Sequence, residues 1–197
     1  LLDGSSAFDI VFQAGEGVAL NIASDLDGLA VGLPPPFNKA REQSESLDID
    51  LRISDALSID ATYSNNLSLA IAQDTEDTWR ALASIGEVRP ELTLDDVDAG
   101  TTVISGRLEE LDISAWADTQ ARFRRGGNPG LPAIVWRDFS VDRLALGETD
   151  FGAFSSTGQY EGGLTSLGLA GDFIKAQIDF DGPEARLNIQ IESLSLD

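Results

Sequence analysis

Hydrophobic and polar residues alternate with a period of two in three consecutive segments of the chain. Residues 47–53 are apolar at every odd position and charged at every even position, and residues 57–63 and 67–71 keep the same odd parity. Because successive side chains of a strand point to opposite faces, each segment predicts a β-strand with one apolar and one polar face. The predicted apolar face holds Leu47, Ile49, Leu51, Ile53, Leu57, Ile59, Tyr63, Leu67, Leu69 and Ile71.

Three-residue gaps separate these segments and predict two hairpins. Directly opposed residues of a hairpin share a face, so the gaps place Leu51 opposite Ile59 and Ala61 opposite Leu69. A three-residue loop commonly ends in a residue of left-handed conformation, and Asn66 suits that position.

Further strands are separated by turn signals rich in glycine, proline and aspartate. They are expected at residues 8–12, 18–22, 29–33, 91–94, 102–108, 139–146, 152–160, 165–171, 176–180 and 185–196. The last two strands add Ile178, Phe180, Leu187, Ile189 and Ile191 to the predicted apolar face.

Helix is scarce in the pattern. Ser114 can cap a short helix over residues 115–123, and residues 78–82 could form a second one with Trp79 turned inward. Residues 34–46 and 124–132 are predicted loops. These elements predict a mainly β protein, a long antiparallel meander with one or two short helices. No linker requires a domain boundary, so residues 1–197 are predicted to be one segment.

Closure of the sheet is not fixed by alternation. A sandwich or barrel would bury the apolar faces, whereas an open, curved sheet would leave them exposed as an apolar concave surface. The odd positions are therefore either core residues or ligand-lining residues.

Composition excludes several kinds of chemistry. The chain has no His, Cys or Met, so it cannot supply an imidazole base, a thiolate nucleophile, a disulfide or a zinc site built from His or Cys. It carries 34 acidic and 13 basic residues, a formal charge of −21. This charge disfavours nucleic acid and anionic membrane surfaces as partners, and it suits a salty environment that screens repulsion.

Acidic residues offer two weaker alternatives. Residues 25–28 and 95–100 resemble fragments of calcium loops, but neither completes the pattern, and turns or solvated surface explain them better. Paired carboxylates could in principle support glycoside hydrolysis, although most acids alternate outward along strands. Trp79, Trp116 and Trp136 are expected to pack or to lie at a rim. The basic cluster Arg122, Arg124 and Arg125 is expected to stabilise a helix C-terminus.

Four segments together resemble the YhdP family, AsmA-like and TamB-related periplasmic proteins of the bridge-type lipid-transfer class. Residues 27–39 are similar to its segment with a D-x-x-G start and an L-P-x-P-hydrophobic-x-K end, and residues 104–116 to its G-x-L-x-x-L-D-hydrophobic-x-x-W segment. Residues 141–152 are similar to its L-x-L-x-G-x-x-F-G strands, and residues 185–194 to the strand that follows. Leu164 stands where the family often places a tryptophan.

The resemblance implies an open or curved half-pipe sheet that shuttles phospholipids passively between the inner and outer membranes and supports outer-membrane lipid homeostasis. It implies a periplasmic protein held in the inner membrane by an anchor outside this chain. The chain starts without Met, a basic region or an apolar region, and we expect it to be an internal piece of a larger protein. The implied partners are phospholipid acyl chains, the rest of the same polypeptide and envelope proteins.

The resemblance brings no catalytic residue, metal or other cofactor, so we expect no enzyme. The fifteen apolar positions named above would then line a lipid groove. A secreted β-sandwich module that binds glycan or protein is the alternative, and a carboxylate-based hydrolase is a third hypothesis.

Overall fold

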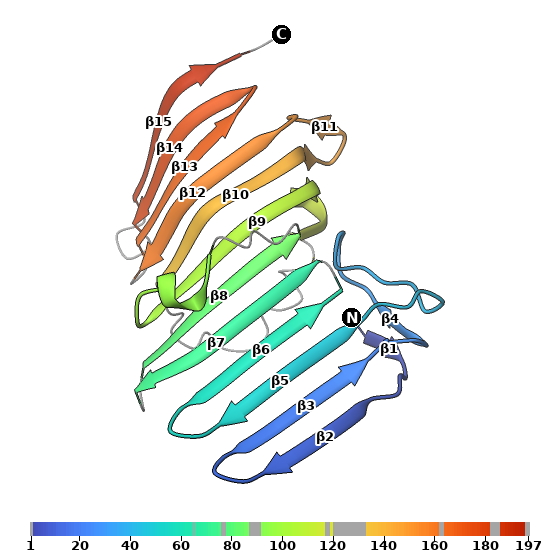
Figure 1. Cartoon of the computed structure of the whole chain (residues 1–197). Coiled ribbons are helices and arrows are strands. Elements are labelled where there is room, and N and C mark those ends of the chain that lie inside the picture. The colour runs from blue at the N-terminus through green and yellow to red at the C-terminus, as the bar shows by residue number, and fades with distance from the viewer. Residues whose placement is uncertain are drawn as a thin grey trace. The chain divides into compact units, whose positions relative to one another are not determined.

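A computed structural model describes residues 2–64, 66–75, 78–86, 92–116, 119, 133–161, 164–181 and 186–195. The chain falls into two compact units, unit 1 (Leu1–Gly100) and unit 2 (Thr101–Asp197). The described residues are mainly in β-strands, as the alternation predicts (Figure 1). No described helix has both the length and the apolar character that a membrane span requires.

The main sheet of unit 1 is an antiparallel meander with the order β8-β7-β6-β5-β3-β2. Its first and last strands do not pair with each other, so the sheet of this unit stays open. Its strands are β2 (Asp9–Ala14), β3 (Val18–Ser24), β5 (Leu47–Ile53), β6 (Leu57–Tyr63), β7 (Leu67–Thr75) and β8 (Thr78–Gly86).

The predicted hairpin register is confirmed. Leu51 lies opposite Ile59, and Ala61 lies opposite Leu69. The expectation for Asn66 is wrong, because the left-handed residue of the described loop is Ser64, with φ 48°. Asn66 instead closes the turn through its backbone N–H, which donates to the carbonyl of Tyr63 at 3.1 Å.

The predicted helix at residues 78–82 is wrong. These residues begin β8, which pairs with β7, and long-range pairing overrides the helical propensity of its Ala, Leu and Arg residues. Trp79 is 38% exposed rather than turned inward.

The predicted strand at residues 91–94 is also wrong in its described part, because Leu94–Asp96 form a 3-10 turn, η1. The Asp96 carboxylate accepts hydrogen bonds from the backbone N–H and hydroxyl of Thr93, both at 2.8 Å. These bonds favour a turn at a site where the sequence suggested a fragment of a calcium loop.

The insert between β3 and β5 contains β4 (Leu29–Val31), which pairs with β1 (Leu2–Gly4), the strand before β2, in a second, two-stranded sheet. Beyond β4, residues 34–46 have no strand apart from an isolated bridge at Lys39, as the loop prediction expects. Lys39 is only 3% exposed, and its Nζ donates to the carbonyls of Leu29 at 2.7 Å and Ala40 at 3.2 Å. The lysine that ends the family-like segment therefore fastens the loop to β4.

Unit 2 contains a sheet with the order β15-β14-β13-β12-β10-β9, and β11 adds to β10. Within unit 2, β9 and β15 do not pair with each other, so this sheet is open as well. Its strands are β9 (Thr101–Asp112), β10 (Ala133–Leu146), β11 (Thr149–Asp150), β12 (Phe154–Glu161), β13 (Leu164–Gly171), β14 (Ile174–Asp181) and β15 (Arg186–Leu194).

One pair of neighbouring strands departs from the meander, because β9 and β10 run parallel. Their connection includes helical residues 113–116 and 119. Ser114 lies inside this helix and not at its cap, since the Asp112 carboxylate accepts from the N–H groups of Ser114 at 2.8 Å and Ala115 at 3.4 Å. The predicted basic cluster at residues 122–125 and the loop at 124–132 lie outside the described residues.

A bulge explains why alternation predicted only the second half of β10. The register steps from Trp136 opposite Ile104 to Phe139 opposite Gly106, so β10 holds one extra residue. Asp138 takes a left-handed φ of 49° there. A bulge changes the parity of a strand, and here it keeps Trp136 and Phe139 on the same face.

Candidate functional site

The register of unit 1 places apolar side chains in rows that cross the strands. One row runs through Leu20, Leu51, Ile59, Ile71 and Ala81. All ten apolar residues predicted for strands β5–β7 lie on this face, which we call the unit 1 apolar face. It comprises Ile10, Phe12, Ala14, Val18, Leu20, Ile22, Ser24, Leu47, Ile49, Leu51, Ile53, Leu57, Ile59, Ala61, Tyr63, Leu67, Leu69, Ile71, Gln73, Trp79, Ala81, Ala83 and Ile85.

None of these residues carries a formal charge, although a quarter of the whole chain does. The opposite face of the same strands carries Asp48, Asp50, Arg52 and Asp60, with Asp50 directly opposite Asp60. The side-chain amide of Asn21 donates to the Asp50 carboxylate at 3.2 Å. Charge is therefore sorted onto one side of the sheet of unit 1.

Among the described elements of unit 1, only η1 lies against a face of the main sheet, and it lies on the polar side. There Arg80 is 3.7 Å from the Asp95 carboxylate, and Leu82 and Ser84 are buried. No described helix or strand covers the apolar face, whose residues are mostly half-buried. Phe12 and Ile10, on the edge strand, remain 64% and 63% exposed.

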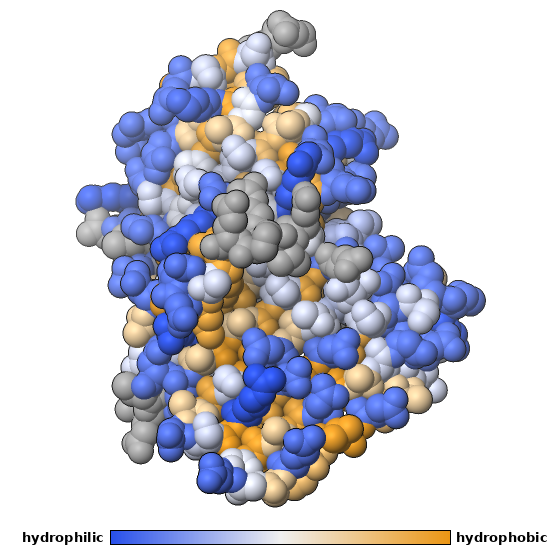
Figure 2. Space-filling model, viewed as in Figure 1, coloured by the Kyte–Doolittle hydropathy of each residue, from blue (hydrophilic) through white to orange (hydrophobic). Residues whose placement is uncertain are grey.

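A charge-free face over which the described residues form no second layer is unusual for a soluble protein and typical of a binding surface. Figure 2 shows hydrophobic side chains exposed at the surface of unit 1. The face could hold an apolar ligand without a change of the strands that form it.

Tyr63 carries a phenol hydroxyl on the unit 1 apolar face. Its Oη is buried and has no hydrogen-bond partner within the described chain. Burial, and then the negative charge of Glu45, raise the pKa of the Tyr63 phenol. Tyr63 therefore lies in a dry part of this face, close to the insert that carries Glu45.

Unit 2 has an apolar face of the same kind. A row crosses it through Ile104, Trp136, Gly158, Leu167 and Ile178 and ends at Ile189. The predicted residues Ile178, Phe180, Leu187, Ile189 and Ile191 all lie on this unit 2 apolar face. On the edge strand β15, Leu187 is 60% exposed and Ile191 is 55% exposed.

Charged residues reach the unit 2 apolar face only at the end near β11, among the residues described. There Arg143 pairs with Glu110 at 2.9 Å and with Asp150 at 2.8 Å. The hydrogen bond from Arg143 lowers the pKa of the Asp150 carboxyl, and the same contact raises the pKa of Arg143. Both side chains are half exposed, so the pairs stabilise the sheet weakly.

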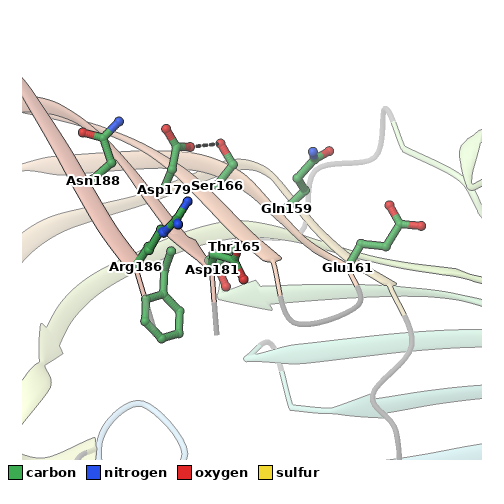
Figure 3. A pocket seen from close by; sticks show the side chains of 9 residues that line it. Gln159, Glu161, Thr165, Ser166, Asp179, Asp181, Arg186 and Asn188 are labelled. Atoms are coloured by element: carbon green, nitrogen blue, oxygen red, sulfur yellow. Dashed lines mark hydrogen bonds between the residues drawn. The ribbon is translucent and has the colours of Figure 1, made fainter. Parts of the chain in front are cut away.

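A cavity of about 610 Å³ lies where the strands β12–β15 end (Figure 3). Most of its polar side chains come from the face opposite the apolar one, whereas Thr165 lies on the apolar face opposite Phe180. The Ser166 hydroxyl donates to the Asp179 carboxylate at 2.8 Å and accepts from the Gln177 amide at 2.8 Å. These polar groups satisfy one another. Across the described residues, no three Asp or Glu side chains are arranged to hold a metal ion.

Several members of the apolar faces escaped the sequence reasoning. In unit 1 they include the β8 residues Trp79 and Ala81, because the pattern of residues 78–82 favours a helix. In unit 2, Trp136 was missed because the bulge at Asp138 breaks the alternation. Val18, Leu20 and Ile22 were predicted as a strand, but alanines at 19 and 23 hid its polar face.

Comparison with known proteins identifies the family. A family model described as YhdP protein matches residues 1–197, the whole chain. No curated protein and no solved structure matches the chain. The family is AsmA-like, related to lipid transport and assigned to the cell envelope, and it is not known as a family of enzymes. The chain therefore belongs to the YhdP family.

Proposed function

We propose that the chain carries phospholipid acyl chains on its two apolar faces, as part of a passive route between the inner and outer membranes. The observation that supports this most is the unit 1 apolar face, which has no charged residue over six strands and no described covering layer. Membership of a lipid-transport-related family supports the choice of ligand.

The energetics suit reversible binding. Removing one methylene group from water contributes about 0.8 kcal/mol, so a fully covered fifteen-carbon chain would gain about 12 kcal/mol. A one-sided face covers only part of each acyl chain and gains correspondingly less. Partial coverage favours a ligand that moves along the rows over one that is held at a single position. Such movement needs no catalytic group.

The cellular setting belongs to the same proposal. The protein works in the periplasm, tethered to the inner membrane by a segment outside this chain. Its partners are the acyl chains, the remainder of its own polypeptide and other envelope proteins. The edge strands β2 and β15 expose large apolar side chains and unpaired backbone groups, which are the features that pair with a further strand.

Native mass spectrometry of the chain purified from a Gram-negative host tests the proposal, with lipid extraction alongside. We expect co-purified phospholipid that is released by organic solvent. Protein that carries no phospholipid, and takes up none from labelled vesicles, would contradict the proposal. Binding on a glycan array without lipid uptake would instead support a β-module that recognises glycans.

A further inference from the structure

The two margins of the unit 1 apolar face differ. At one margin, which we call the hairpin margin, the last row contains Ile53 and Leu57 beside the β5–β6 turn, and Gln73 opposite Trp79. At the other margin, which we call the insert margin, the last row contains Leu47, Tyr63, Leu67 and Ile85.

The insert margin is occupied by residues 25–46. The Asn66 side chain donates to the Pro36 carbonyl at 3.2 Å, and the backbone N–H of Ser64 donates to the Ser46 carbonyl at 2.7 Å. The Tyr63 hydroxyl at this margin is buried without a partner. The insert therefore lies against the strand ends here, and its Glu45 adds a negative charge.

The hairpin margin is more exposed. Ile53 is 47% exposed and the Trp79 indole is 38% exposed. The Trp79 carbonyl accepts a hydrogen bond from the Gly100 N–H at 2.9 Å, which fixes the backbone below the indole. An exposed indole on an otherwise apolar face is suited to the boundary between hydrocarbon and water, where tryptophan is enriched in membrane proteins.

The face is wide enough for one acyl chain that lies along the strands. Trp79 and Ile85 are six residues apart on β8, which corresponds to about 20 Å at about 3.4 Å per residue. The hydrocarbon of one membrane leaflet is about 15 Å thick, half of a bilayer core of about 30 Å. An acyl chain of that length, lying along the strands, would therefore fit between the two margins and cover about three-quarters of the distance.

Building on the proposed function, we infer that Trp79 positions the ester groups of a bound phospholipid at the hairpin margin, with the acyl tails directed towards Tyr63. The opposite orientation would place the phosphate against the insert, which occupies that margin. A phosphate at the hairpin margin stays in water, and the indole bridges the glycerol region and the tails. Trp79 is thus a positioning residue for the ligand.

Quenching of tryptophan fluorescence by brominated phosphatidylcholine tests this orientation. The wild-type chain and the Trp79→Phe variant are each loaded with lipid that carries bromine at carbons 6 and 7 or at carbons 11 and 12 of one tail. The difference between the two proteins is the signal of Trp79. We expect bromine near the ester to quench this signal at least twofold more strongly than bromine further along the tail.

A second variant separates the failure of this inference from the failure of the proposed function. Trp136 lies in the middle of a row of the unit 2 apolar face, so the difference between wild type and Trp136→Phe reports occupancy by lipid alone. Quenching of Trp136 without any quenching of Trp79 overturns the inference. Quenching of Trp136 together with quenching of Trp79 that is as strong, or stronger, with the distal bromines as with those near the ester overturns it as well. Absence of quenching at both tryptophans contradicts the proposed function itself.

Discussion

Leu51 lies directly opposite Ile59 in the β5–β6 ladder, and both side chains project from the unit 1 apolar face. A carboxylate at this place would meet the acyl chain and would have to give up its hydration, at a cost of several kcal/mol. We therefore expect Ile59→Asp to lower the amount of co-purified phospholipid by about tenfold or more, since about 1.4 kcal/mol corresponds to tenfold in binding.

Asp60→Asn is the matched control, one residue away on the opposite face. It relieves the like-charge pair with Asp50, and we expect the free energy of unfolding to rise by about 0.2–1 kcal/mol. Lipid content should stay unchanged. Equal loss of lipid in both variants, with both folded by circular dichroism, would remove the assignment of ligand contact to one face.

The buried Lys39 should be more important for stability than the exposed Arg41. Lys39→Met removes two charge-assisted hydrogen bonds to carbonyls that hold the insert, and we expect a loss of about 1.5–3 kcal/mol in unfolding free energy. Arg41→Ala removes a pair with Asp3 in which both side chains are more than half exposed, and should cost about 0–1 kcal/mol.

Chemical denaturation measures both variants, and hydrogen exchange shows where protection is lost. For Lys39→Met, protection should fall first in β1 and β4. If Arg41→Ala proves as damaging as Lys39→Met, Lys39 does not have the fastening role that its buried hydrogen bonds indicate.

Gly158 permits the close approach of β12 and β13 within the row that contains Trp136. A Cβ at this position would come within 2.5 Å of the Ser166 carbonyl oxygen, closer than real contacts allow. We expect Gly158→Ala to lower the unfolding free energy by about 1–3 kcal/mol. Thermal unfolding of the variant checks this. Gly100→Ala is the control for backbone strain without crowding, because Gly100 has φ +78° and open space around its Cβ position.

Burial and Glu45 raise the pKa of the Tyr63 phenol. The unfolded chain therefore ionises Tyr63 at lower pH than the folded chain does, and the protein should lose stability as the pH rises above the ordinary phenol pKa of 10.0. Tyr63→Phe should abolish the part of this loss that belongs to Tyr63. At neutral pH it should also stabilise by about 1 kcal/mol, because it removes a buried hydroxyl without a partner.

Urea unfolding of wild type and Tyr63→Phe at neutral pH and at pH above 10 provides the comparison. Destabilisation of the variant at neutral pH would show that the hydroxyl makes a favourable interaction. An unchanged alkaline loss of stability would assign that loss to other groups.

Strict alternation made β5 and β6 predictable in extent, and β5, β6 and β7 predictable in register, because the odd positions are apolar and most of their neighbours are polar. β7 continues to Thr75, beyond the alternating residues 67–71. The same rule did not reveal β8, where Ala81, Leu82 and Ala83 suit helix and strand alike. Pairing with β7 decides that segment, and pairing is a long-range property that local sequence does not carry.

The candidate site was predictable only as a set of positions. The odd-numbered apolar residues between Leu47 and Ile71 share one face because the hairpin loops preserve parity. The spacing of these positions can be read directly from the sequence. The place of Trp136 depends on a bulge, and the contrast between the two margins depends on the fold of the insert around Lys39. Neither feature leaves a periodic signal in the chain.

Photocrosslinking tests the central claim most directly, namely that acyl chains contact one face of the sheet. A benzophenone amino acid is placed at position 59 on the apolar face, or at position 60 on the polar face, and the protein is irradiated in cells. The account predicts a phospholipid adduct by intact-mass spectrometry at position 59 and none at position 60. Equal adducts at both positions, or an adduct at position 60 alone, would contradict it.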